Sequence, residues 1–174
     1  QFSGQFAWQY EQFRGEVTTT GPSRDWQLVS GSGKADLLAD LPIGTLGQTQ
    51  LMGKPGSDLT GVLQDGQFVG VTGDLAWSYD GFLAGKAQIS QPRQTIREID
   101  GVLQATVIAA KALPGNPRVV VQPGEAEALT VELRGSVPTR YRGTLGYQYE
   151  QWLQGTVAVA GELLDFSTLA GTSS

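Results

Sequence analysis

A short pattern that occurs three times constrains the fold of this chain more than any other feature of the sequence. Its clearest copy is residues 73–85, GDLAWSYDGFLAG, and the other copies occupy residues 4–15 and 143–155. Each copy runs glycine, polar, apolar, small, aromatic, polar, tyrosine and acid, with an aromatic near the turn and a closing glycine. The apolar, aromatic and tyrosine positions alternate with polar or small ones, which puts the three on one face of a strand. The pattern predicts a β-hairpin or a sharply bent pair of strands.

The spacing of the copies indicates an internal repeat. They begin at Gly4, Gly73 and Gly143, about 70 residues apart. The second and third copies also agree upstream, where Leu59, Thr60 and Leu63 match Leu129, Thr130 and Leu133. The first copy lacks this upstream half. We therefore predict an all-β fold of repeated antiparallel β meander units, with a period of about 70 residues. The units would form a curved or partly closed sheet or a sandwich, and the sequence leaves closed barrel, sandwich and open groove as alternatives.

The aromatic positions of the three copies have two interpretations. In the first, they belong to the core, because a half-buried sheet favours Tyr and Trp on one strand face. In the second, they form an exposed ladder that binds sugar, lipid or peptide. The candidate ligand or partner face consists of Trp8, Tyr10, Trp77, Tyr79, Tyr147 and Tyr149.

Composition limits the class of protein. With 174 residues, of which 40% are hydrophobic, the chain is long enough for one domain with a real core, and we expect a single domain over residues 1–174. The 24 glycines lie among short apolar alternations, which is typical of many short strands joined by tight turns. The net charge is −5 and the 12 Lys and Arg residues form no basic stripe, which argues against nucleic acid as a partner.

The chain contains no Cys and no His. Thiol catalysis, disulfides and Ser-His-Asp arrangements are therefore excluded, and so are most transition-metal sites. Carboxylates remain, but the acid of the pattern recurs as Glu11, Asp80 and Glu150, which fits a solvated turn residue better than a catalytic pair. No calcium-loop spacing is present. We predict no enzyme activity, no cofactor, and no catalytic or metal-binding residues.

Turn signals divide the rest of the chain into short strands. Strands are predicted at residues 59–63, 68–71, 75–79, 82–89 and 101–110, with tight turns at Asp65-Gly66 and Asp80-Gly81. Further strands are expected at 26–30, 118–122, 128–134, 139–150 and 152–160, and in the stretch 162–168. Breaks or turns are expected at 21–23, 31–33 and 54–57, a turn or short helical turn at 41–47, a loop at 114–117 and a disordered end at 171–174.

The chain resembles the type II secretion system protein N family (GspN) over most of residues 4–171. Three features carry the resemblance: the Gly-x-Leu-x-Trp strand at 73–77, the leucine-rich segment leading into Leu41-Pro42-Ile43-Gly44-Thr45-Leu46, and Leu-x-Gly turns such as 63–66 and 133–135. Members of this family are inner-membrane proteins with one membrane-spanning helix and a periplasmic β domain. The resemblance implies a periplasmic β domain, tethered through an N-terminal segment that this sequence does not contain. It transfers no catalytic motif.

We therefore expect a non-catalytic accessory or scaffold component of a Gram-negative type II protein secretion system. It would act in the periplasm by contact with other secretion-system proteins, through an exposed strand edge or an aromatic face. The main alternative is an AsmA-like periplasmic domain that binds or transfers lipid in a β-groove. A glycan-binding module or a carboxylate glycosidase is a third alternative, which requires exposed Trp beside paired acids.

Overall fold

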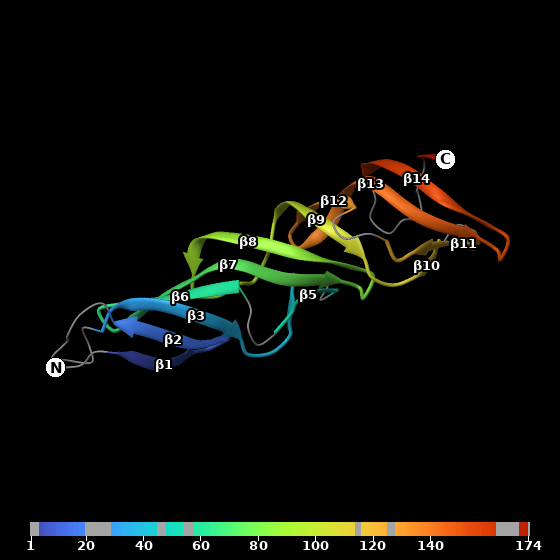
Figure 1. Cartoon of the computed structure of the whole chain (residues 1–174). Coiled ribbons are helices and arrows are strands. Elements are labelled where there is room, and N and C mark those ends of the chain that lie inside the picture. The colour runs from blue at the N-terminus through green and yellow to red at the C-terminus, as the bar shows by residue number, and fades with distance from the viewer. Residues whose placement is uncertain are drawn as a thin grey trace. The chain divides into compact units, whose positions relative to one another are not determined.

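The protein is an antiparallel β structure (Figure 1). The computed structural model describes residues 4–19, 29–44, 48–53, 58–113, 116–124, 128–162 and 171–173, and these contain strands and no helix. Fifteen strands belong to one hydrogen-bonded sheet, which does not close into a barrel. The prediction of an all-β, antiparallel fold is confirmed.

The described residues form fifteen strands. They are β1 Gln5–Tyr10, β2 Phe13–Thr19, β3 Gly31–Leu37, β4 Leu41–Ile43, β5 Thr49–Leu51, β6 Asp58–Gln64, β7 Gln67–Tyr79, β8 Leu83–Arg93, β9 Gly101–Val107, β10 Lys111–Leu113, β11 Asn116–Gln122, β12 Leu129–Arg134, β13 Val137–Tyr149, β14 Leu153–Glu162 and β15 Gly171–Ser173.

The chain divides into two compact units. Unit 1 comprises residues 1–41, 51–75 and 87–97, and unit 2 comprises residues 42–50, 76–86 and 98–174. The long strands β7 and β8 contribute residues to both units. The expectation of a single domain stays a prediction.

Unit 1 is built on the strand order β1-β2-β3-β6-β7, in which every neighbour is antiparallel. Alternate residues of these strands point to one buried side, as a sheet with period 2 requires. The fully buried members include Phe13, Val17, Leu59 and Val71. Burying such apolar side chains contributes about 25 cal/mol for each Å² removed from water, and this stabilises the packed face of the sheet.

Unit 2 is built around β13. This strand pairs with β12 and β11 through its two halves and with β14 along most of its length. The start of β8 and strand β12 flank β9, and β15 adds to β14. The core includes Trp77, Leu83, Val131, Tyr141 and Leu145, none more than 1% exposed.

The second copy of the sequence pattern forms the predicted hairpin. Leu75 and Trp77 are fully buried and Tyr79 is nearly so, while Asp80 lies exposed in the turn that leads to β8. The Asp65-Gly66 turn is also confirmed. Its two residues have φ of 51° and 74°, the left-handed pair that a tight two-residue hairpin turn requires.

Six predictions of local structure are wrong. Residues 68–71 and 75–79 belong to one continuous strand, β7, and Leu41–Ile43 forms strand β4 instead of a turn. The expected break at Gly31–Gly33 is the start of β3, and residues 171–173 form β15 instead of a disordered end. Residues 116–117 of the expected loop belong to β11, and residues 29–30 of the expected strand lie outside a strand. The expected features at 21–23, 26–28, 54–57, 114–115 and 163–168 lie outside the described residues.

Local geometry recurs at an offset of 70 residues, the distance between Gly73 and Gly143, where the second and third copies of the sequence pattern begin. Strands β3 and β9 begin at Gly31 and Gly101, and strands β4 and β10 begin at Leu41 and Lys111, so both pairs keep this offset. The β6–β7 and β12–β13 hairpins carry register shifts at Val62/Leu63 and Glu132/Leu133, again at the same offset. The repeat period itself stays a prediction.

Candidate contact site

The structure divides the six aromatic residues of the candidate face between the two units. Trp8 and Tyr10 lie on β1 in unit 1, whereas Trp77, Tyr79, Tyr147 and Tyr149 lie on β7 and β13 in unit 2. They are therefore considered separately, and their use as a ligand or partner face stays a prediction.

In unit 1, the aromatic side chains of β1 pack on the sheet. The ring centroids of Trp8 and Tyr10 lie 4.9 and 4.6 Å from that of Phe68. The indole also lies over glycines, since a Cβ atom at Gly15 would come within 2.7 Å of Cζ2 of Trp8. Glycine leaves room here for the ring of the neighbouring strand, an arrangement known to fix strand register.

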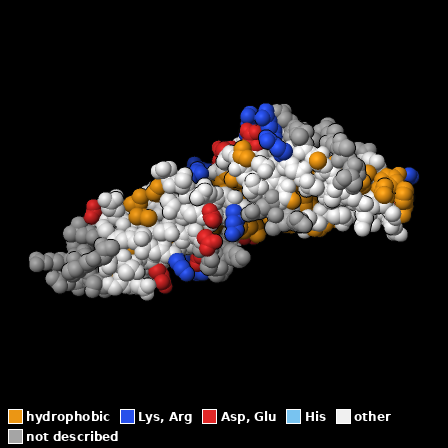
Figure 2. Space-filling model, turned by 45° about the horizontal axis from the view of Figure 1, so that its top comes forward, with side chains coloured by type: hydrophobic (Ala, Val, Ile, Leu, Met, Phe, Trp, Pro, Cys, Tyr) orange, Lys and Arg blue, Asp and Glu red, His pale blue; other side chains and the backbone are white. Residues whose placement is uncertain are grey.

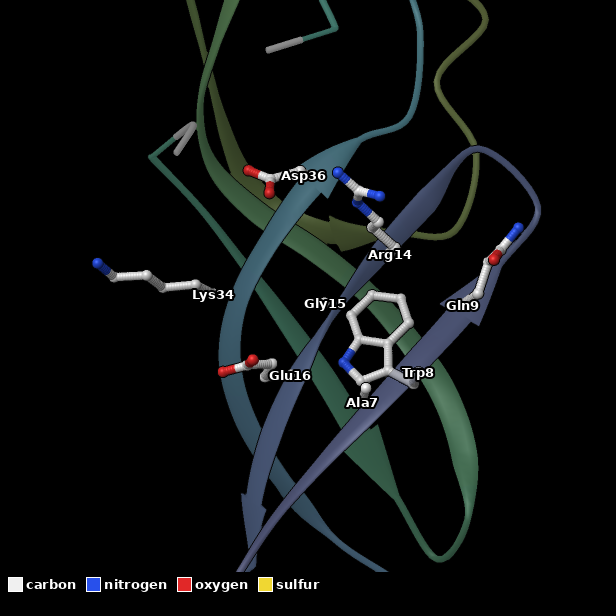
Figure 3. Close-up of a pocket in the computed structure, with 8 residues that line it drawn as sticks. All are labelled: Ala7, Trp8, Gln9, Arg14, Gly15, Glu16, Lys34 and Asp36. Atoms are coloured by element: carbon white, nitrogen blue, oxygen red, sulfur yellow. The ribbon is translucent and has the colours of Figure 1, made fainter. Parts of the chain in front are cut away.

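A shallow cleft of about 630 Å³ lies beside Trp8 on strands β1, β2 and β3 (Figure 3). Figure 3 shows the indole across β2 at Gly15, and the side chains of Arg14 and Asp36 directed toward each other. The other charged residues that line the cleft are Glu16 and Lys34. Two cationic and two anionic side chains balance, so the cleft has no net charge that would favour an ionic ligand.

In unit 2, Trp77 and Tyr79 belong to the interior. Trp77 is fully buried against Gly85, where a Cβ atom would come within 3.0 Å of Cζ2 and Nε1 of the indole. The hydroxyl of Tyr79 donates to Oε1 of Gln48 at 3.0 Å. These contacts make the aromatic face of the second copy part of the core.

The third copy differs from the second. Tyr147 and Tyr149 are half-buried on β13, and they pair across to Gly155 and Leu153 of β14. Tyr149 also makes an edge-on contact with Trp152, with ring centroids 6.0 Å apart and planes at 88°. This is the T-shaped arrangement that aromatic quadrupoles favour.

The turn that joins β13 to β14 carries the most exposed large hydrophobic side chain among the described residues. Trp152 is 71% exposed, and its neighbour Leu153 is 43% exposed. Figure 2 shows hydrophobic side chains gathered at the end of unit 2 where Figure 1 places this turn. The indole is nevertheless held in place, because its Nε1–H donates to Oε2 of Glu150 at 3.1 Å. Arg118 in turn contacts Oε1 of Glu150 at 3.5 Å.

Sequence reasoning noted an aromatic near each turn but did not assign it a role. The three residues concerned are Phe13, Phe82 and Trp152, which are 0%, 3% and 71% exposed. A usable signal existed, because the position changes from Phe to Trp in the third copy only. Trp is enriched at protein interfaces, where one side of the ring is apolar and the N–H finds a polar partner.

The recurring acids occupy strained turn positions. Glu11, Asp80 and Glu150 have φ of 46°, 52° and 53°, the left-handed region that non-glycine residues adopt in tight turns. Asp80 and Glu150 are each paired with a basic side chain, Lys111 at 3.6 Å and Arg118 at 3.5 Å. This placement agrees with the interpretation of the acids as solvated turn residues. The described residues contain no group of three or more acidic side chains arranged to hold a metal ion.

Comparison with known protein families, curated proteins and solved structures gives no match for this chain. Within the described parts of the chain, no helix has the length and hydropathy needed to cross a lipid bilayer. The turn Glu150–Leu153 is therefore selected as the candidate contact site on its geometry alone.

Proposed function

We propose that this chain is a non-catalytic accessory or scaffold component of a Gram-negative type II protein secretion system. The sequence resemblance to the protein N family supports this assignment, together with its periplasmic location and an inner-membrane tether. The mode of action is contact with other proteins of the secretion system. No step of chemistry is assigned to the chain.

The observation that carries the contact function is the exposure of Trp152 in a fixed orientation. A side chain that is 71% exposed gains little burial free energy in the isolated chain. Its hydrogen bond to Glu150 and its ring contact with Tyr149 restrict its rotamers. A partner that covers the indole would therefore bury a large apolar surface at a small entropic cost, as hot-spot residues of interfaces do.

The lipid alternative requires an apolar trough along the aromatic face. Trp77 and Tyr79 fill that place in unit 2, since they are 0% and 8% exposed. Their burial favours protein contact over a lipid groove in this unit. Native mass spectrometry of the purified chain checks the alternative directly, because a lipid carrier would retain a bound lipid.

A pull-down with the purified chain against the components of a type II secretion system tests the proposal. We expect at least one component to be retained, and Trp152→Ala to reduce its retention about tenfold, a loss typical of an interface hot spot. Val102→Ala is the matched control, because Val102 is an equally exposed apolar residue of unit 2, at 66%. Retention of no component, together with normal secretion after deletion of the protein, would sink the proposal.

A further inference from the structure

We draw no further inference here: the strongest candidate, the group of three exposed arginines Arg134, Arg140 and Arg142 on the face of the β12–β13 hairpin opposite its core, carries nothing, because Glu132 already pairs with Arg134 and Arg140 and nothing in the structure shows what partner Arg142 would contact.

Discussion

The two hairpin turns of unit 2 have nearly the same backbone and opposite surroundings. Asp80 and Glu150 share a left-handed φ, and their amides donate to the equivalent carbonyls of Gln48 and Arg118. The aromatic that follows is buried in one turn and 71% exposed in the other. The difference arises from strand β9, which pairs beside the first turn and leads into Lys111 over its ring.

This contrast separates local from long-range causes. The turn itself is fixed by short-range geometry, so it forms wherever the pattern occurs. Burial of the aromatic depends on a strand from further along the chain, which the pattern does not encode.

The largest expected effect on stability comes from truncating the central aromatic residue of the second copy, Trp77, compared with that of the third copy, Tyr147. Trp77→Ala should lower the free energy of unfolding by about 4 kcal/mol, because it removes a fully buried indole and leaves a cavity beside Gly85. The equivalent Tyr147→Ala should cost about 1–2 kcal/mol, because Tyr147 is only half-buried. Urea unfolding followed by circular dichroism measures both. Equal losses would mean that the two copies are packed alike, and the contrast would be lost.

The next effect compares the turn aromatics directly. Phe82→Ala should destabilise the protein by about 3 kcal/mol, since the ring packs under β9 and Lys111. Trp152→Ala should change stability by less than about 0.5 kcal/mol, as for other exposed positions. Thermal melts of both variants and of Val102→Ala give the comparison. A loss for Trp152→Ala close to that for Phe82→Ala would show that the second turn is covered in solution.

The sequence pattern predicted which side chains share a face of a hairpin strand, but it did not predict which side chains are exposed. Leu75, Trp77 and Tyr79 share a face because side chains alternate along any strand, and that follows from spacing alone. The exposure of Trp152 could not be read in the same way, because it depends on which distant strand pairs with β14. The predicted candidate face comprised six aromatic residues on the strands of the three copies, whereas the most exposed aromatic of the described residues, Trp152, lies in a turn.

The errors in strand assignment have physical causes as well. Pro42 predicted a turn, yet it lies in β4, a three-residue strand. Among the described strands β4 pairs with β5 alone, and such an edge tolerates a residue without an N–H. Gly31 and Gly33 predicted a break, yet they lie within β3. A Cβ atom at either position would collide with the backbone of β2, at Thr18 or Glu16. Glycine here marks a close approach of two strands.

A smaller effect on stability is expected at the turns that join β6 to β7 and β12 to β13. Ser136 is buried at a φ of 66°, and its Oγ accepts a hydrogen bond from the amide of Ile99 at 2.8 Å. Ser136→Ala should cost about 1–2 kcal/mol, because it keeps the Cβ and the left-handed backbone but leaves that buried amide without its acceptor. Ser136→Gly should cost about 1 kcal/mol less, because glycine relieves the strain of a left-handed residue that carries a Cβ.

The matched control for Ser136 is Gly66, the equivalent position of the β6–β7 hairpin, which is exposed and has a φ of 74°. Gly66→Ala should cost only about 1 kcal/mol, because it adds left-handed strain and removes no side-chain hydrogen bond. Chemical denaturation of the three variants separates the two contributions. If Ser136→Ala proved neutral, the hydroxyl would not be holding Ile99, and the two turns would differ only in exposure.

The smallest effect concerns the ion pairs beside the two turns. Asp80→Asn and Glu150→Gln should each lower stability by less than about 0.5–1 kcal/mol, because all four charged side chains are at least 30% exposed. Raising the salt concentration to about 0.5 M should reduce both losses by screening. Asp80→Asn should retain the larger part of its loss in salt, since Lys111 also lies over the buried Phe82 ring and losing its partner frees it to leave that ring. At Glu150 the cation has no ring to cover, so salt should erase the loss. Equal retention of the two losses in salt would contradict this difference between the turns.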